Sequence, residues 1–211
     1  MTGPRGPESS ARAPPVGERG FCLWLTGLPS AGKTSIGREL VPRLRARGLP
    51  VEFLDGDEVR QGLSADLGFD RASRETHAAR VTFVAKVLAR NDVVAIVALI
   101  SPYRSSRAKA RAEIGRFVEI YVDTPLSVCE ERDVKGLYRK ARAGEITGMT
   151  GIDDPYEPPE RAEITLATLG RAPAESAEEL LNELRRLGWL PGSGGATPSA
   201  GRDRERPRSL P

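Results

Sequence analysis

The chain has 211 residues, a length typical of one domain, and its 39% hydrophobic and 29% charged residues allow a buried core. Its net charge of +3 comes from the two ends: residues 1–20 carry three Arg and two Glu, and residues 191–211 carry four Arg, one Asp and one Glu. Residues 21–190 are therefore formally neutral, which excludes a dedicated nucleic-acid binder, because such a protein concentrates basic charge on its folded part.

The composition changes sharply at both ends of the chain. Residues 1–20 and 191–211 are rich in Pro, Gly, Ser and Arg and poor in aliphatic residues. Such segments cannot bury enough apolar surface to offset their ordering entropy. We therefore expect two disordered tails around a single folded domain at 21–190.

The apolar segments and the cysteines indicate where in the cell the protein is located. The first 20 residues contain no apolar stretch typical of a signal peptide, and the longest fully apolar run, residues 93–100, is too short to span a membrane. Cys22 and Cys129 lie in apolar patterns without zinc-ligand spacing, so we expect two buried thiols. These features predict a cytoplasmic protein without a membrane partner.

Apolar runs alternate with helix-length segments along the domain. The predicted strands cover residues 21–27, 51–55, 93–100, 117–123 and 163–168. The predicted helices cover residues 33–47, 73–90, 103–115, 126–132 and 176–187. Near-continuous runs rich in Val and Ile are typical of strands buried on both faces. We expect an α/β fold with a five-stranded, mostly parallel sheet, helices on both faces, and ligands beyond the carboxyl ends of the strands.

The first predicted strand ends in a complete GxxxxGK[ST] motif, the P-loop. Its residues are Gly27, Leu28, Pro29, Ser30, Ala31, Gly32, Lys33 and Thr34. The glycines let backbone N–H groups turn toward phosphate oxygens at the start of a helix. Lys33 is expected to bridge the β- and γ-phosphates and the Thr34 hydroxyl to reach Mg²⁺, which predicts an ATP-dependent phosphotransferase.

The second predicted strand ends in Asp55-Gly56-Asp57. A carboxylate at this position can hold Mg²⁺, so we assign Asp55 to the metal together with Thr34. A neighbouring carboxylate can orient or deprotonate an acceptor hydroxyl, which makes Asp57 a candidate catalytic and substrate-binding residue. The alternative is that Asp57 only caps the next helix.

The third predicted strand ends at Ser101, followed by Pro102. Ser101 is a candidate to accept or bind phosphate, and the alternative is that it starts the next helix. That helix carries four cations, Arg104, Arg107, Lys109 and Arg111. We assign Arg104 to substrate binding and expect the other three to form a solvated face.

Further cations follow the fourth predicted strand. Residues 132–142 hold five cations and one anion, interrupted by Gly136. Such a segment, with Lys135 near its middle, can close over the triphosphate as a lid, or it can be a solvated helix face. Guanidinium groups suit anionic acceptors, and the candidates for this role are Arg60, Arg74 and Arg80.

Four segments resemble the adenylyl-sulfate kinase family: GLPSAGKTS, LDGDEVRQGLSADLGF, ISPYR, and the stretch from VDTPLSVCEERD through GMTGIDDPYEPPE. The resemblance runs from about Phe21 to Thr168. It implies a P-loop NTPase fold, often homodimeric, that uses ATP and Mg²⁺ to phosphorylate the 3′-hydroxyl of adenosine 5′-phosphosulfate.

The resemblance also implies roles for individual residues. Asp57 corresponds to the residue beside the 3′-hydroxyl, and Ser101 to a serine described as a phosphoserine intermediate. Lys135 belongs to the lid. The acceptor-site positions are Arg60, Phe69 and Arg74, with Phe69 expected to stack on adenine.

Two positions depart from the family pattern. His77 stands where the family has an acceptor-binding Asn, and Met149 stands where the family has the Phe that completes the adenine sandwich. Sulfur over an aromatic base is a workable contact, so Met149 stays in the predicted acceptor site. His77 stays there as well, because it occupies the position of the acceptor-binding Asn. For the lone His77 the alternative is an exposed structural role. Two other functions remain open: a kinase for a different small acceptor, and a silent nucleotide-binding homologue that regulates a partner.

Overall fold

The structure, a computed structural model, describes residues 20–191. It contains one five-stranded sheet with the strand order β2-β3-β1-β4-β5, and every neighbouring pair is parallel. The strands are β1 (Phe21–Thr26), β2 (Val51–Asp55), β3 (Val94–Ala98), β4 (Phe117–Asp123) and β5 (Ile164–Ala167). The predicted α/β class is confirmed, and among the described residues the sheet is parallel throughout.

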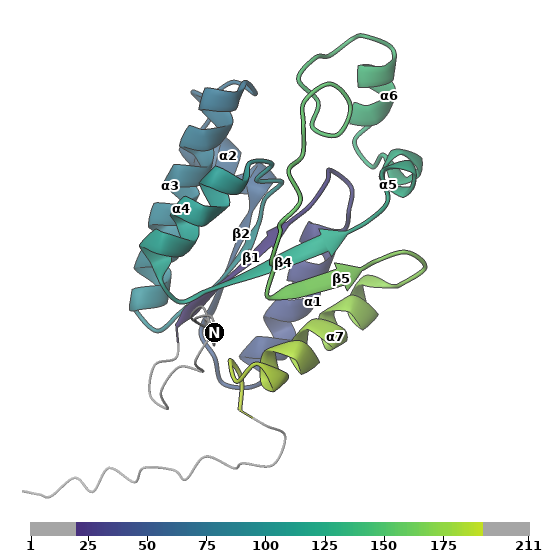
Figure 1. The fold of residues 1–211 in the computed structure, drawn as a ribbon. Helices are drawn as coiled ribbons and strands as arrows, with labels where there is room; N and C mark the ends of the chain where they lie inside the picture. Colours follow the sequence, from purple (N-terminus) through teal and green to yellow (C-terminus); the bar gives the residue numbers. More distant parts are fainter. Residues whose placement is uncertain (1–19, 192–211) are drawn as a thin grey trace, which may run out of the picture.

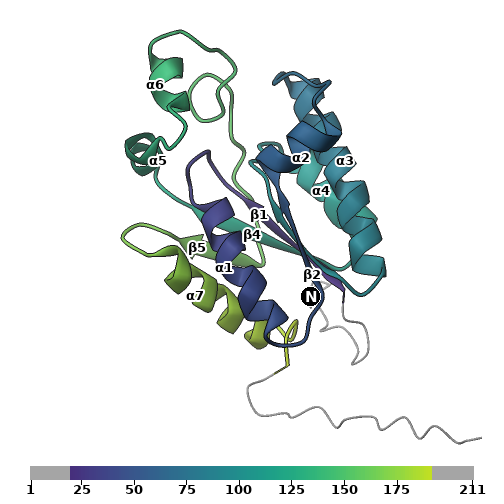
Figure 2. The ribbon, with the colours of Figure 1, turned by 180° about the vertical axis from the view of Figure 1, so that it is seen from behind.

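Helices cover both faces of this sheet, as predicted (Figure 1). They are α1 (Lys33–Arg45), α2 (Gly56–Leu63), α3 (Arg71–Arg90), α4 (Arg104–Ile114), α5 (Leu126–Arg132), α6 (Leu137–Arg142) and α7 (Pro173–Arg186). Figure 2 shows α1 and α7 on one face and α3 and α4 on the other. The short helices α2 and α6 are additions to the five predicted ones.

The core consists of two clusters, one on each face of the sheet. On β1, Leu23 and Leu25 belong to the cluster under α1 and α7, and Cys22 and Trp24 belong to the cluster under α3 and α4. All six residues of β1 are buried, which explains why its sequence lacks an alternating pattern. The prediction that Cys22 and Cys129 are buried thiols is confirmed.

The carboxyl ends of the parallel strands define one edge of the molecule. Helices α5 and α6 lie beyond this edge, above the β1–α1 connection (Figure 1). None of the helices within residues 20–191 is long and apolar enough to cross a membrane. The tails predicted at 1–20 and 191–211 lie outside the described residues, except for Gly20, which is buried, and Pro191. The predicted domain bounds stay a prediction.

Candidate active site

The P-loop connects β1 to α1, and it requires glycine at two positions for different structural reasons. A Cβ on Gly27 would lie 2.6 Å from the carbonyl oxygen of Val122, so no larger residue fits there. Gly32 caps α1 with a φ of 107°, a left-handed conformation that other residues rarely adopt. The backbone thus turns tightly into the N-terminus of α1, where N–H groups and the helix dipole favour an anion.

Lys33 lies inside this loop rather than in solvent. Its Nζ donates hydrogen bonds to the carbonyl oxygens of Gly27 at 2.8 Å and Leu28 at 2.7 Å. Burial lowers the pKa of Lys33 to about 8. The ammonium is therefore held beside the positions where the motif predicts phosphates.

Asp55 and Asp57 have different environments. Asp55 is buried and caps α2, because its Oδ1 accepts the backbone N–H of Asp57 at 3.0 Å. The alternative that Asp57 is the cap is therefore wrong. The other oxygen of Asp55, Oδ2, is buried and has no hydrogen-bond partner among residues 20–191.

An unpartnered buried carboxylate oxygen is unfavourable unless a cation or an ordered water satisfies it. Carboxylate and hydroxyl oxygens, which Asp55 and Thr34 supply, are the ligands that Mg²⁺ prefers, together with water and phosphate. Within residues 20–191, no three His, Cys, Asp or Glu side chains are grouped to hold a metal by themselves. The residues present fit a Mg²⁺ ion shared with a nucleotide.

The segment 132–142 contacts the P-loop, as expected of a lid. The Tyr138 hydroxyl donates to the carbonyl oxygen of Pro29 at 3.0 Å, and Arg132 donates to that of Ala31 at 3.3 Å. Lys135 forms an ion pair with Asp57. Tyr138 is buried, whereas Arg132 and Lys135 are exposed, so the lid role of these cations stays a prediction. Sequence reasoning missed the part played by Tyr138, although it is the only aromatic residue in this cationic stretch.

The predicted acceptor residues Arg60, Phe69 and Arg74 lie together. The guanidinium carbon of Arg60 is 4.6 Å from the ring centroid of Phe69, whose side chain is 63% exposed. Arg74 donates to the carbonyl oxygens of Phe69 and Gly148, both at 2.7 Å, and so joins the two loops that carry Phe69 and Met149. Met149 itself is only 7% exposed and packs in the larger core cluster. Phe69 is thus the accessible member of the predicted adenine sandwich.

His77 is buried, so the alternative of an exposed structural role is wrong. Its Nδ1 lies 2.9 Å from the Oγ of the fully buried Ser64. Burial lowers the pKa of His77 to about 4, and the charges of Arg60 and Arg80 add to this effect. The ring is therefore neutral near pH 7 and supports the chain just before Phe69.

Ser101 lies beyond β3 and is buried. Its Oγ accepts a hydrogen bond from the indole Nε1 of Trp24 at 3.0 Å. Helix α4 begins only at Arg104, with Tyr103 at the capping position, so the alternative that Ser101 starts the helix is wrong. Ser101 also has a φ of 44°, in the left-handed region.

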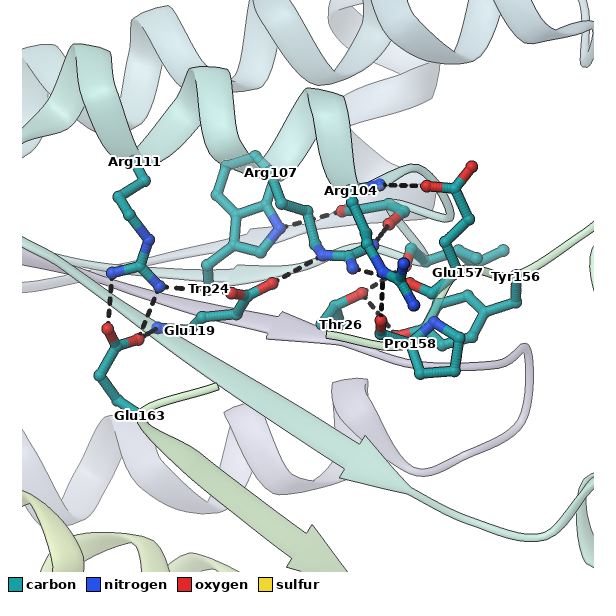
Figure 3. Close-up of polar contacts among 12 residues, drawn as sticks. Trp24, Thr26, Arg104, Arg107, Arg111, Glu119, Tyr156, Glu157, Pro158 and Glu163 are labelled. Carbon is teal, nitrogen blue, oxygen red and sulfur yellow. Dashed lines mark hydrogen bonds and ion pairs between the residues drawn. The ribbon is translucent and has the colours of Figure 1, made fainter. Parts of the chain in front are cut away.

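The basic run on α4 differs from its prediction (Figure 3). Arg107, expected on a solvated face, is 2% exposed and paired with the buried Glu119, so that expectation is wrong. Arg104, assigned to substrate binding, donates to the carbonyl oxygen of Pro158 at 2.7 Å and pairs with Glu160. Its assignment to substrate binding stays a prediction.

Known proteins are similar to this chain in sequence and in fold. The model of the adenylylsulphate kinase family matches residues 19–167. An adenylyl-sulfate kinase of Synechococcus sp. (strain JA-3-3Ab) is 52% identical over 175 residues, which cover 83% of this chain and 99% of the relative. That of Halothermothrix orenii is 49% identical over 173 residues, 82% of this chain and 94% of the relative.

A solved APS kinase of Mycobacterium tuberculosis, in complex with AMPPNP and APS, superposes with a TM-score of 0.75 and 43% identity over 79% of this chain and 98% of that one. A hexameric APS kinase of Thiobacillus denitrificans has a TM-score of 0.64 and 37% identity over 82% of this chain and 30% of that one. The family resemblance predicted from the sequence is confirmed. The chain belongs to the adenylylsulphate kinase family.

Proposed function

We propose that this chain transfers the γ-phosphoryl group of ATP to the 3′-hydroxyl of adenosine 5′-phosphosulfate, giving ADP and 3′-phosphoadenylyl sulfate. The observation that supports this most directly is the juxtaposition, at one edge of the sheet, of a complete P-loop and the cluster of Arg60, Phe69 and Arg74. The related kinase of Mycobacterium tuberculosis was solved with an ATP analogue and APS together.

On the donor side, the P-loop backbone and Lys33 hold the triphosphate. Lys33 already lies in the loop, and the phosphate oxygens replace the two carbonyl oxygens that its Nζ now contacts. Thr34 and Asp55 are the residues that would hold Mg²⁺, which, when bound, neutralises charge on the β- and γ-phosphates. The unpartnered Oδ2 of Asp55 supports this assignment.

On the acceptor side, Phe69 offers an exposed ring for the adenine, and guanidinium groups offer planar donors for the phosphosulfate. Arg60 lies against Phe69, and Arg74 braces the loop that carries it. Neutral His77 is hydrogen-bonded to Ser64, which precedes this loop in the chain. The base and the anion of the acceptor thus bind to neighbouring side chains.

Transfer is then a direct in-line displacement. The 3′-oxygen attacks the γ-phosphorus, the bond to the bridging oxygen of ADP breaks, and the carboxylate of Asp57 takes the hydroxyl proton. Lys135, paired with Asp57, brings the lid and its positive charge over the reacting groups. Ser101 acts as a hydrogen-bond donor to phosphate in this scheme, without a covalent intermediate.

The test uses the full chain with ATP and Mg²⁺ and a panel of acceptors: adenosine 5′-phosphosulfate, AMP, shikimate and gluconate. Release of ADP with adenosine 5′-phosphosulfate alone is the expected result. The second candidate function is a kinase for a different acceptor, and the departures at His77 and Met149 are the observation in its favour. ADP release with another compound but not with adenosine 5′-phosphosulfate would establish it. A homodimer and a cytoplasmic location stay predictions.

A further inference from the structure

Arg107 is the most deeply buried arginine of residues 20–191, and it bonds to three groups near the carboxyl ends of the strands. It projects from α4, and its Nε donates to the Oε1 of Glu119 on β4 at 2.6 Å. Its Nη1 donates to the carbonyl oxygen of Ser101 at 2.6 Å, and its Nη2 to that of Glu157 at 2.7 Å (Figure 3). One guanidinium therefore joins the end of β3 to residues 156–160, a segment we call the strap.

The strap is bonded to the ends of two central strands. The hydroxyl of Thr26, on β1, donates to the carbonyl oxygen of Ile100 at 2.7 Å. Because a hydroxyl has one hydrogen, the Tyr156 hydroxyl, 2.9 Å away, is the donor to Thr26. The backbone N–H of Glu157 donates to the carbonyl oxygen of Pro102 at 2.8 Å. The strap and the Ser101 turn thus form one bonded unit with Arg107 at its centre.

Ser101 needs such support because its φ of 44° is unfavourable for a residue with a side chain. Backbone of this kind persists when the surrounding structure holds it, and it is concentrated at functional sites. Two groups hold Ser101: Arg107 binds its carbonyl oxygen, and Trp24 binds its Oγ.

The bond from Trp24 also decides what the serine hydroxyl can do. The indole nitrogen is a donor only, so Oγ is the acceptor in this bond and its own hydrogen stays available. Within residues 20–191, no group accepts a hydrogen bond from that hydroxyl. Ser101 is therefore arranged to donate to an oxygen that the protein itself does not supply, such as a phosphoryl oxygen.

We propose that Arg107 is a positioning residue for phosphoryl transfer, which fixes the Ser101 backbone and the strap together so that the Ser101 hydroxyl is held as a donor to the transferred phosphoryl group. This proposal rests on the proposed function and deepens it. Its physical basis is geometric, because misplacing a contact group by about 1 Å can lower a rate by about 100-fold. Arginine is required here because only a planar fork of donors reaches three acceptors in fixed directions.

Arg111 is a matched control on the same helix, one turn further on. It pairs with the same Glu119 at 3.3 Å and with Glu163 at 2.6 Å, and its side chain is 37% exposed. None of its hydrogen bonds or ion pairs involves Ser101 or the strap. A substitution there disturbs the Glu119 pair but removes no bond of Ser101 or the strap; its one link toward Trp24 is indirect, through Phe117, whose ring the Arg111 guanidinium approaches to 4.9 Å.

The test compares Arg107→Lys with Arg111→Lys in the full chain, in steady-state kinetics with ATP and adenosine 5′-phosphosulfate. Lysine at 107 keeps a positive charge opposite Glu119 but cannot make all three bonds. We expect kcat to fall by about tenfold or more in Arg107→Lys, with both KM values within about threefold of wild type. We expect Arg111→Lys to stay within about twofold in kcat.

A second readout does not depend on activity. The indole N–H resonance of Trp24, assigned by its loss in Trp24→Phe, reports the bond to Ser101. We expect this resonance to shift clearly more in Arg107→Lys than in Arg111→Lys, because Arg111 reaches Trp24 only through the ring of Phe117. If Arg107→Lys does not fold, Glu119→Gln keeps the arginine but weakens its anchor, and the same shift with a smaller loss of kcat is expected.

Three outcomes would overturn the proposal: wild-type kcat with an unmoved Trp24 resonance in folded Arg107→Lys, equal losses in the two lysine variants, or an unmoved resonance in Glu119→Gln. These outcomes are distinct from failure of the proposed function. If the wild type does not use adenosine 5′-phosphosulfate, the proposed function fails, and the Trp24 resonance still tests whether Arg107 holds Ser101.

Discussion

The buried His77 makes the stability of the chain depend on pH in a way that can be isolated, because it is the only histidine. Its pKa of about 4 in the folded chain lies below the ordinary 6.5, owing first to burial and then to Arg60 and Arg80. The unfolded chain therefore takes up the proton first as the pH falls. Stability from the neutral ring is complete above pH 6.5 and is lost as the pH falls toward 4.

The size of this effect follows from the gap between the two pKa values. About 2.5 pKa units at 1.36 kcal/mol each set an upper limit of about 3 kcal/mol, and with solvent screening we expect about 1–2 kcal/mol by pH 5. The assay is urea unfolding of wild type and His77→Asn at pH 7.5, 6 and 5. Asparagine can still bond to Ser64 but does not titrate. Between pH 7.5 and pH 5, the free energy of unfolding of the wild type should therefore fall by about 1–2 kcal/mol more than that of the variant.

Proton NMR measures the pKa of His77 in the folded protein directly, since a single histidine yields one resolvable Hε1 resonance. We expect its midpoint near pH 4. A midpoint between pH 6 and 7, or the same pH dependence of stability in wild type and His77→Asn, would refute the assignment of a buried neutral ring bonded to Ser64.

Two further predictions concern the reacting groups. Lys33→Ala should fold normally, since the hydrogen bonds of the Lys33 ammonium within residues 20–191 go to P-loop carbonyl oxygens, and it should lower kcat by about 100-fold or more. Retention of over a tenth of wild-type turnover would contradict the role of Lys33. Ser101→Ala should keep measurable transfer, with inversion at a chirally labelled γ-phosphorus, because direct transfer needs no covalent step; net retention, with phosphate recovered on Ser101 at a competent rate, would contradict direct transfer.

The features predictable from sequence are those that local pattern determines. Buried parallel strands are apolar almost without interruption, so β1 and β3 were recognisable, and the P-loop motif fixes its own place between a strand and a helix. The short helices α2 and α6 were not, because their eight and six residues are too few to show a clear helical periodicity. Their stability comes from capping and tertiary contact.

The site residues that sequence reasoning misplaced depend on contacts between distant segments. Arg107 has the sequence context of a solvated basic face, and its burial follows from Glu119, 12 residues later, inside the apolar strand FVEIYVD. A lone carboxylate at a buried strand position implies a cationic partner, so Glu119 was the available signal. His77 and Ser64 are 13 residues apart, and no local pattern indicates that they meet.

The most direct test of the proposed function is the specificity constant of the wild-type chain for adenosine 5′-phosphosulfate, with the product identified by ³¹P NMR. The proposed mechanism predicts a kcat/KM of at least about 10⁴ M⁻¹s⁻¹, within the usual range for an enzyme on its own substrate, and a phosphate on the 3′-oxygen. A kcat/KM below about 10² M⁻¹s⁻¹, or phosphorylation elsewhere on the nucleotide, would contradict it.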